Sequence, residues 1–257
     1  MDYTLILMVV GAVFLGSLMR ATFGFGDSVV SMPLLALLPI PFSVSVSLIG
    51  LTGMTTALMS IQRGWKDKDP VVIKKLTLAT IIGIPVGLIL VRFAEQSVIN
   101  LILGSVLVIY SMYSLTASPA RRDYLQAKFE NPNYSYPFGF LGGMLGSAYN
   151  MNGIPVVLYA AARDWTPRQF LGTVQSHFLI SSVFVISGHA LSGFWNWDVA
   201  IYFAFSVPVV ALAMYIGRKI YNKIDTDKFR TYIFIMILIL GAVNIGNFIR
   251  FLNFWCW

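Results

Sequence analysis

Apolar stretches separated by short polar ones make up most of this 257-residue chain. Several of them are long enough to cross about 30 Å of hydrocarbon as a helix. In the stretch at 73–91, Gly83 and Gly87 form a small-residue face that suits close helix packing. The pattern predicts an all-α polytopic membrane protein. The predicted spans are 4–22, 42–61, 73–91, 97–117, 169–187, 199–216 and 231–249, and shorter apolar helices are predicted at 28–38, 135–148 and 154–162.

The first apolar run is broken at Arg20–Pro33, which reads R-A-T-F-G-F-G-D-S-V-V-S-M-P. Gly24 and Gly26 interrupt a helix there, because glycine weakens a helix interior by about 1 kcal/mol relative to alanine. Asp27 and Ser28 are good N-cap residue types for a helix that restarts. A broken helix in a membrane leaves backbone groups unpaired, and protein or a polar cavity must cover them. Such breaks are common where transporters bind substrate.

A second break interrupts the apolar run at 136–162, where residues 149–155 read Y-N-M-N-G-I-P. A shift of 126 positions superposes the two broken stretches without a gap, and it places Phe14-Leu15-Gly16 on Phe140-Leu141-Gly142. Identities are few, so it is the pattern that predicts an internal repeat.

Positive charge differs between equivalent loops of the two halves. The loop region at 63–75 is rich in Lys and Arg, whereas its counterpart at 188–197 has none. The next loop reverses this, with Arg92 alone in the first half and a basic run at 218–230 in the second. Because cytoplasmic loops are enriched in Lys and Arg, equivalent loops lie on opposite sides. The halves are therefore predicted to be inverted repeats at 1–117 and 135–257, joined by a cytoplasmic linker at 118–134.

In this arrangement each repeat is a broken-helix hairpin followed by three transmembrane helices. The N-terminus is then outside, most of the 18 Lys and Arg residues are cytoplasmic, and the two hairpin tips approach the midplane from opposite faces. Each hairpin either enters and leaves on the same side or consists of two full crossings, and the sequence leaves both alternatives open.

The composition excludes a largely soluble protein. It is 57% hydrophobic and 11% charged, whereas soluble domains average about 25% charged. The net charge of +7 sits in short loops beside apolar spans, which indicates control of topology and not nucleic-acid binding. The single Cys256 excludes an intramolecular disulfide. The N-terminal M-D-Y-T lacks the features of a signal peptide, so we expect it to be retained.

The two breaks resemble the motifs of the sulfite exporter TauE/SafE family. The first has the family's G-F-G-x-x-x-x-x-x-P-L-L pattern at 24–35, and the second has a form of its G-x-G-G-P-P-x-x-x-Y pattern at 150–159. Asp27 stands where the family usually has glycine, and Asn150 and Asn152 replace two glycines of the second motif. The resemblance implies export of sulfite, organosulfonates or related oxyanions across a bacterial inner membrane.

The two breaks are also the candidate substrate site. Helices that restart after them present free N–H groups and a positive dipole end, which suit an oxyanion. In the alternative, the glycines and prolines only shape tight hairpin tips. The candidate substrate-binding residues are Arg20, Phe23, Gly24, Phe25, Gly26, Asp27, Ser28, Tyr149, Asn150, Met151, Asn152, Gly153, Ile154, Gln175 and His177.

The charged candidates have several alternative roles. Placing the Asp27 side chain at membrane depth costs about 2.5–3.5 kcal/mol on insertion scales. We therefore expect one of three roles for it: it caps the restarting helix, pairs with Arg20 or carries a coupling proton. Arg20 either binds the anion or pairs with Asp27. Because an ionised Asp27 repels an anion, simultaneous binding requires a protonated or neutralised carboxyl. His177, which lies mid-span near Gln175, is either satisfied by a neighbouring hydroxyl or lines the pathway.

We expect a secondary transporter that exports a small sulfur oxyanion by alternating access. An importer of thiosulfate or sulfate is the alternative, and so is an anion channel, because broken helices also line pores. The sequence has no metal-ligand cluster, P-loop or Ser/His/Asp arrangement, so we expect no enzyme activity, cofactor or metal. The expected partners are the oxyanion and membrane lipid, with protons and a second copy in a homodimer as further candidates.

Overall fold

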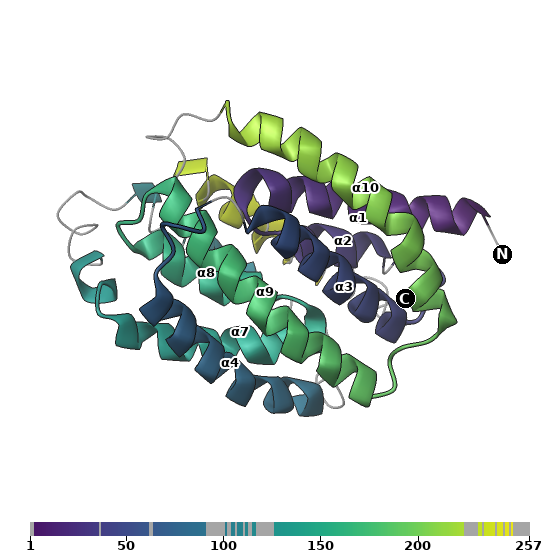
Figure 1. The fold of residues 1–257 in the computed structure, drawn as a ribbon, viewed down its shortest axis with the longest axis horizontal. Helices are drawn as coiled ribbons and strands as arrows, with labels where there is room; N and C mark the ends of the chain where they lie inside the picture. The colour runs from purple at the N-terminus through teal and green to yellow at the C-terminus, as the bar shows by residue number, and fades with distance from the viewer. Residues whose placement is uncertain are drawn as a thin grey trace.

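The structure is a computed structural model of the chain, and its described residues form helices and connecting turns without a strand (Figure 1). It describes residues 3–35, 37–61, 64–90, 101, 104–105, 107–109, 111–112, 115–116, 126–223, 231–232, 234–239, 241–243, 245–246 and 248. In chain order the helices are α1 (Tyr3–Phe23), α2 (Asp27–Leu35), α3 (Phe42–Ser60), α4 (Pro70–Leu90), the 3₁₀ helix η1 (Pro132–Tyr134), α7 (Ser135–Tyr149), α8 (Gly153–Ala162), α9 (Pro167–Leu191) and α10 (Trp197–Tyr221).

Five described helices are long and apolar enough to cross a membrane, namely α1, α3, α4, α9 and α10. Large apolar side chains such as Leu7, Ile82 and Leu191 are exposed on them, as expected of surfaces that face lipid. The chain is therefore a multi-pass membrane protein. The predicted spans at 97–117 and 231–249 are described only in part.

Helix α2 is shorter than predicted, because it ends at Leu35 and not at Leu38. The chain beyond it tightens into turns, in which the N–H of Leu37 donates to the carbonyl of Leu34 at 3.2 Å and that of Leu38 to Leu35 at 3.0 Å. Such i to i+3 bonds are common at helix ends. Pro39 follows and cannot continue the helix.

Helices from the two halves of the chain are interleaved. Helix α4 lies along α7, and α1 lies along α10. Helix α3 packs against both α9 and α10, and α4 also packs against α9. Within each half, α1 packs on α2 and α3, and α7 packs on α8 and α9. The most extensive helix packing is therefore between the two halves and not within either of them.

Glycines allow α4 and α7 to approach backbone to backbone. A Cβ added at Gly83 would lie 2.1 Å from the carbonyl oxygen of Phe140, and one added at Gly143 would lie 2.1 Å from that of Thr80. The hydroxyl of Thr80 also donates to the carbonyl of Gly139 at 2.9 Å. The small-residue face predicted at Gly83 is therefore confirmed, and α7 supplies a matching face.

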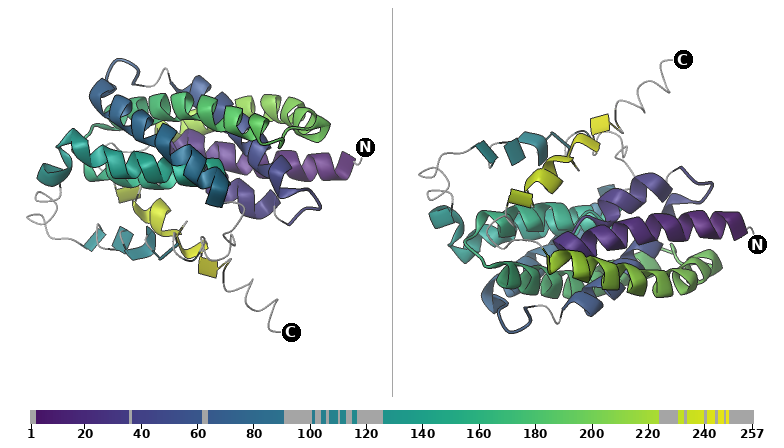
Figure 2. Two further views of the ribbon diagram at one scale, coloured as in Figure 1. Left: turned by 90° about the horizontal axis from the view of Figure 1, so that it is seen from below. Right: turned by 90° about the horizontal axis from the view of Figure 1, so that it is seen from above.

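Positive charge collects at one end of the molecule, which we call the basic end and define by residues 64–75, 126–135, 163–168 and 218–223. Every Lys and Arg that the structure describes lies there, except Arg20. Lys75 Nζ donates to Asn133 Oδ1 at 2.6 Å, which joins two of these segments. Helix α7 begins at this end, whereas α1 begins at the opposite end (Figure 2).

Asp69 ties the two halves together at the basic end. Its Oδ1 accepts from the N–H groups of Val71 and Val72, both at 3.0 Å, and so caps α4. Its Oδ2 lies 3.7 Å from Nη2 of Arg163, and its own N–H donates to Oγ1 of Thr173 at 2.9 Å. The start of α4 is thus fixed to the segment that joins α8 and α9.

Candidate functional site

Arg20 and Asp27 form an ion pair across the first break. Arg20 lies on the last turn of α1 and is 4% exposed, and Asp27 begins α2. Gly24 and Gly26 have φ angles of 88° and 94°, a region that glycine enters without the penalty other residues pay. This turn brings Nη1 of Arg20 within 2.6 Å of Oδ2 of Asp27. Pairing, one of the roles that the sequence left open for both residues, is therefore observed.

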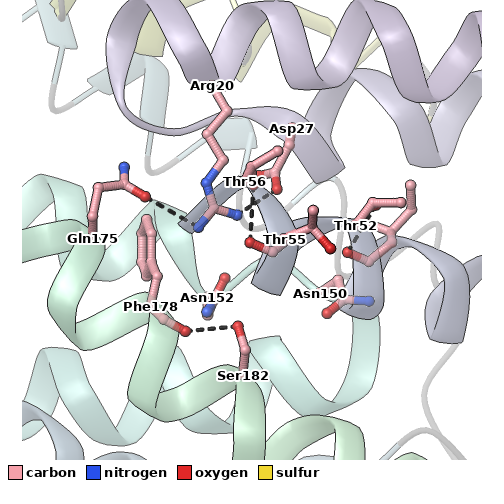
Figure 3. Close-up of polar contacts among 12 residues, drawn as sticks. Arg20, Asp27, Thr52, Thr55, Thr56, Asn150, Asn152, Gln175, Phe178 and Ser182 are labelled. Carbon is pink, nitrogen blue, oxygen red and sulfur yellow. Dashed lines mark hydrogen bonds and ion pairs between the residues drawn. The ribbon is translucent and has the colours of Figure 1, made fainter. Parts of the chain in front are cut away.

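Gln175 of α9 forms a hydrogen bond to the Arg20 member of this ion pair (Figure 3). Nη2 of Arg20 donates to Oε1 of Gln175 at 3.3 Å, and Nε2 of Gln175 donates to the carbonyl of Gly24 at 2.6 Å. The amide thereby satisfies a backbone group that the broken helix would otherwise leave unpaired. The guanidinium also lies over the ring of Phe178, with Cζ 4.9 Å from the centroid.

The guanidinium of Arg20 has hydrogen-bonding capacity left over. A guanidinium carries five N–H donors in a planar fork. Among the described residues, its buried Nε has no hydrogen-bond partner. Arg20 is therefore a buried cation that has one carboxylate ligand and at least one unused donor.

A small cavity adjoins the ion pair and is bounded by both breaks. It leaves room for the centre of a water molecule over about 10 Å³, which is about one water. A Cβ at Gly53 would lie 3.2 Å from Nη1 of Arg20, so this glycine contributes to the space. A sulfite-sized oxyanion is larger than this and must displace a side chain or widen the cavity. The lining residues are Arg20, Asp27, Ile49, Gly50, Gly53, Asn150, Asn152, Ser182 and Val185.

The second break contributes neutral amides. Asn150 ends α7 with a φ of 56°, in the left-handed region that asparagine tolerates better than most residues. Its Nδ2 donates to the carbonyl of Val46 on α3. Nδ2 of Asn152 lies 3.5 Å from Oγ of Ser181 on α9. Both asparagines thus line the cavity, and hydrogen bonds to α3 and α9 hold them there.

The two breaks meet in the interior of the protein. A Cβ added at Gly153, the first residue of α8, would lie 3.5 Å from the Phe178 ring and 3.7 Å from Cβ of Phe25. Phe178 in turn lies under the guanidinium of Arg20. The second half therefore contacts the first break directly, and the candidate residues of both breaks are brought together.

Several predicted residues pack beside this centre without lining the cavity. Phe25, Met151 and Ile154 are buried in one apolar cluster with Phe178, and Phe23 packs against that cluster. Ser28 is buried on α2. The ring of Tyr149 lies 5.9 Å from that of Phe42 in an edge-on arrangement.

His177 also lies outside the cavity lining. It is fully buried, and its Nδ1 lies 3.4 Å from Oγ1 of Thr77 on α4. Thr77 thus supplies a neighbouring hydroxyl, which was one of the two sequence interpretations. Nε2 of His177 has no hydrogen-bond partner among the described residues.

The sequence predictions missed the contributions of α3 and of the second half of α9. The cavity residues Ile49, Gly50 and Gly53 come from α3, and Ser182 and Val185 come from α9. A signal was present in α3, whose segment 43–56 reads S-V-S-V-S-L-I-G-L-T-G-M-T-T. Small and hydroxyl-bearing residues at such density indicate a helix that packs on protein.

The charge and the donor groups of this site suit an anion. Among the residues that the structure describes, no group of three or more His, Cys, Asp or Glu side chains gathers to hold a metal ion. A buried arginine with neutral amide and hydroxyl groups around it can bind an oxyanion through several N–H donors.

Comparison with known proteins matches the chain to a family. The family model described as Sulfite exporter TauE/SafE matches residues 9–244, which is most of the chain and includes both breaks. Neither the curated proteins nor the solved structures contain a match.

Proposed function

Because the chain belongs to the sulfite exporter TauE/SafE family, we propose that it exports a small sulfur oxyanion, such as sulfite or an organosulfonate, from a site at Arg20. The family is one of membrane transporters of sulfite and related sulfur anions, which implies a non-enzymatic role. The proposal places the site between the two breaks in a bacterial inner membrane and moves the anion by alternating access.

The main support for this proposal is the ion pair between Arg20 and the carboxylate of Asp27. Asp27 is itself an oxyanion, and it sits 2.6 Å from a guanidinium that is 4% exposed. In our proposal the substrate competes with Asp27 for Arg20, because the adjoining cavity is too small to hold both. Protonation of Asp27 would weaken its hold on the guanidinium and admit the anion, which offers a way to couple transport to protons.

We further propose that the halves at 1–117 and 135–257 are inverted repeats. The packing pairs between α-helices support this, because each corresponds to a pair, or to itself, when the halves are exchanged. Contact of α4 with α7 corresponds to contact of α10 with α1, and contact of α3 with α10 corresponds to contact of α9 with α4. The opposite starting ends of α1 and α7 agree with it. The basic end is then cytoplasmic and the N-terminus outside.

Single-cysteine labelling tests this topology in a Cys256→Ser background. Cysteines at positions 68 and 223 should react with an impermeant reagent only from the cytoplasmic side, because both lie at the basic end. A cysteine at position 192, in the loop between α9 and α10, should react only from outside. Labelling of all three positions from one side would contradict the inverted arrangement.

A wide cavity at the basic end suits the loading of an anion. Its volume is about 870 Å³, and Lys66, Arg168 and Arg218 line it together with one acidic residue, Asp67. Leu171 lies in its lining and also against the first break, where a Cβ at Gly24 would come within 2.5 Å of it. We assign to this vestibule the role of concentrating anions before they pass Leu171.

Neutralising the three cations of the vestibule to glutamine should lower the initial transport rate at low ionic strength. The difference should shrink at high salt, because screening removes steering between exposed charges. An equal loss at all salt concentrations would argue against a steering role.

Counterflow in proteoliposomes tests the transport function itself. Vesicles loaded with unlabelled sulfite should transiently accumulate labelled sulfite above its outside concentration, which a carrier produces and a channel does not. The same assay with thiosulfate, sulfate and organosulfonates ranks the substrates, and imposed pH gradients in both orientations distinguish export from import. Absence of counterflow for every anion would overturn the proposal.

A further inference from the structure

A groove between α4 and α9 lies beside the vestibule at the basic end. Its volume is about 390 Å³, and most of its lining is apolar. Lys68 precedes α4, and Lys74 lies on its first turns, so the two lysines mark the end of the groove nearest the basic end. Its apolar part is formed by Ile73, Leu78, Leu179 and Ile180.

The charge of this groove has one sign. Among the described residues that line it, Lys68 and Lys74 are cationic and none is acidic. Asp69, which lies between them in sequence, is already engaged with Arg163 and the start of α4. The ammonium of Lys68 lies 2.9 Å from the ring centroid of Trp65, which is 49% exposed. Tryptophan and lysine together are typical of the depth of lipid headgroups.

Polar groups follow one turn deeper. Thr77 and Ser176 line the groove, and a helical turn separates Thr77 from Lys74, or about 5 Å. The hydroxyl of Ser176 is buried and has no hydrogen-bond partner among the described residues. Leu78 and Ile180, which lie beside these hydroxyls, are exposed. The groove thus has its two lysines at one end, and hydroxyl groups and exposed apolar side chains deeper along it.

We propose that the groove binds one anionic phospholipid of the leaflet at the basic end. Its phosphate lies between Lys68 and Lys74, its ester carbonyls lie at the level of Ser176, and an acyl chain follows Leu78 and Ile180. A soluble anion would not contact the apolar part of the groove, and a neutral lipid would not match the charge of its two lysines. Anionic phospholipids carry both features. The site is separate from Arg20 and does not depend on the transport function.

Native mass spectrometry of the purified chain tests this with two probes of equal acyl composition, phosphatidylglycerol and phosphatidylcholine. The wild type should retain phosphatidylglycerol about 30-fold more tightly, since each lysine contributes about 1 kcal/mol toward an anionic lipid. Lys68→Gln/Lys74→Gln should abolish this preference and leave phosphatidylcholine binding unchanged. Circular dichroism and gel filtration confirm that each variant is folded.

The matched control is Lys128→Gln/Lys219→Gln, which removes the same charge from the basic end outside the groove. It should keep the preference for phosphatidylglycerol. A loss of preference in the control equal to that in Lys68→Gln/Lys74→Gln would overturn the site in favour of a general charge effect. An unchanged preference in Lys68→Gln/Lys74→Gln would overturn it outright. Displacement of the lipid by millimolar inorganic phosphate would show a soluble-anion site and would also contradict the proposal.

Discussion

The two breaks use one backbone device with different chemistry. In each, a helix ends, a residue with positive φ turns the chain, and a short helix restarts beside the first. The first break carries a buried cation and a carboxylate, Arg20 and Asp27, whereas the second carries the neutral amides Asn150 and Asn152. At the position of the second half that matches Arg20 stands Gly146.

We expect this difference to give the two breaks separate tasks. A charge buried at membrane depth requires a partner, which for Arg20 is Asp27 in the structure and the anion in our proposal. The neutral amides of the second break can form hydrogen bonds to an anion without adding charge. We therefore expect the first break to bind the charge of the anion and the second to place neutral hydrogen-bonding groups around it.

The largest expected effect comes from removal of the cation. Arg20→Gln should lower anion affinity by roughly 10–100-fold, because hydrogen bonds to charged groups contribute about 1.5–3 kcal/mol. It should also destabilise the fold by about 3–5 kcal/mol, because Asp27 loses its partner. Binding isotherms and thermal unfolding in detergent measure the two effects.

The double variant Arg20→Gln/Asp27→Asn separates binding from folding. It carries no unpaired charge, so thermal stability should return toward that of the wild type, while transport should remain lost. A transport rate of the double variant equal to that of the wild type would show that Arg20 is not the anion ligand.

A second contrast concerns the glycines of the breaks. Gly24→Ala places a Cβ at a φ of 88° and within 2.5 Å of Leu171, so it should destabilise the protein by about 1–3 kcal/mol. Gly153→Ala meets only ordinary contacts, at 3.5 Å from Phe178, and should leave stability within about 0.5 kcal/mol or raise it slightly. Equal losses of thermal stability in the two variants would contradict this asymmetry.

Replacing the carboxylate should produce a smaller effect on anion affinity, of opposite sign, although it leaves the buried Arg20 without its carboxylate partner. Asp27→Asn removes the resident oxyanion, and asparagine is tolerated at helix starts about as well as aspartate. Sulfite affinity should rise roughly tenfold, because Arg20 no longer has a competing carboxylate. The stabilisation by added sulfite should rise with it. An unchanged sulfite affinity would show that Asp27 and the substrate do not share Arg20.

The same variant tests proton coupling. If Asp27 carries the proton, Asp27→Asn should keep anion exchange in proteoliposomes and lose its stimulation by a pH gradient. A pH-gradient response equal to that of the wild type would remove the carboxyl from the coupling step.

The smallest expected effect on anion affinity is at the second break. Asn150→Gly keeps the positive φ without strain and loses only the hydrogen bond to Val46, which should cost about 0.5–1.5 kcal/mol of stability. Asn150→Ala should cost more, because alanine disfavours that backbone conformation. Anion affinity should change less than in Arg20→Gln. A loss of affinity as large as that of Arg20→Gln in a stable Asn150→Gly protein would show that both breaks recognise charge.

Local chemistry explains what the sequence predicted well. Gly24 and Gly26 directly precede the N-cap residue types Asp27 and Ser28, so the first break could be located from local residue types, and the second break at Asn150–Gly153 could be located in the same way. The face at Gly83 followed from the 3.6-residue period of a helix. Helix ends were less accurate, as the early end of α2 shows, because turns compete with helix over the last few residues.

Contacts between distant segments could not be predicted in this way. The sequence contained Gln175 as a polar residue in a span, but which backbone group its amide meets depends on how α9 packs against the first break. Gly50 and Gly53 carry no chemical mark of a site, and they line the cavity only because α3 lies at the centre of the molecule. The sequence therefore predicts where helices form, but not which helices pack against one another.

The interleaving of α4 with α7 and of α1 with α10 has a consequence for the assembly of the chain. Neither half can bury its glycine-lined helix surface by itself, because the complementary surface belongs to the other half. If the halves are inverted repeats, as we propose, a polypeptide of half this length would have to pair with a second one in the opposite orientation to obtain the same contacts. Synthesis of the first half therefore leaves the glycine-lined surface of α4 uncovered until α7 has been made.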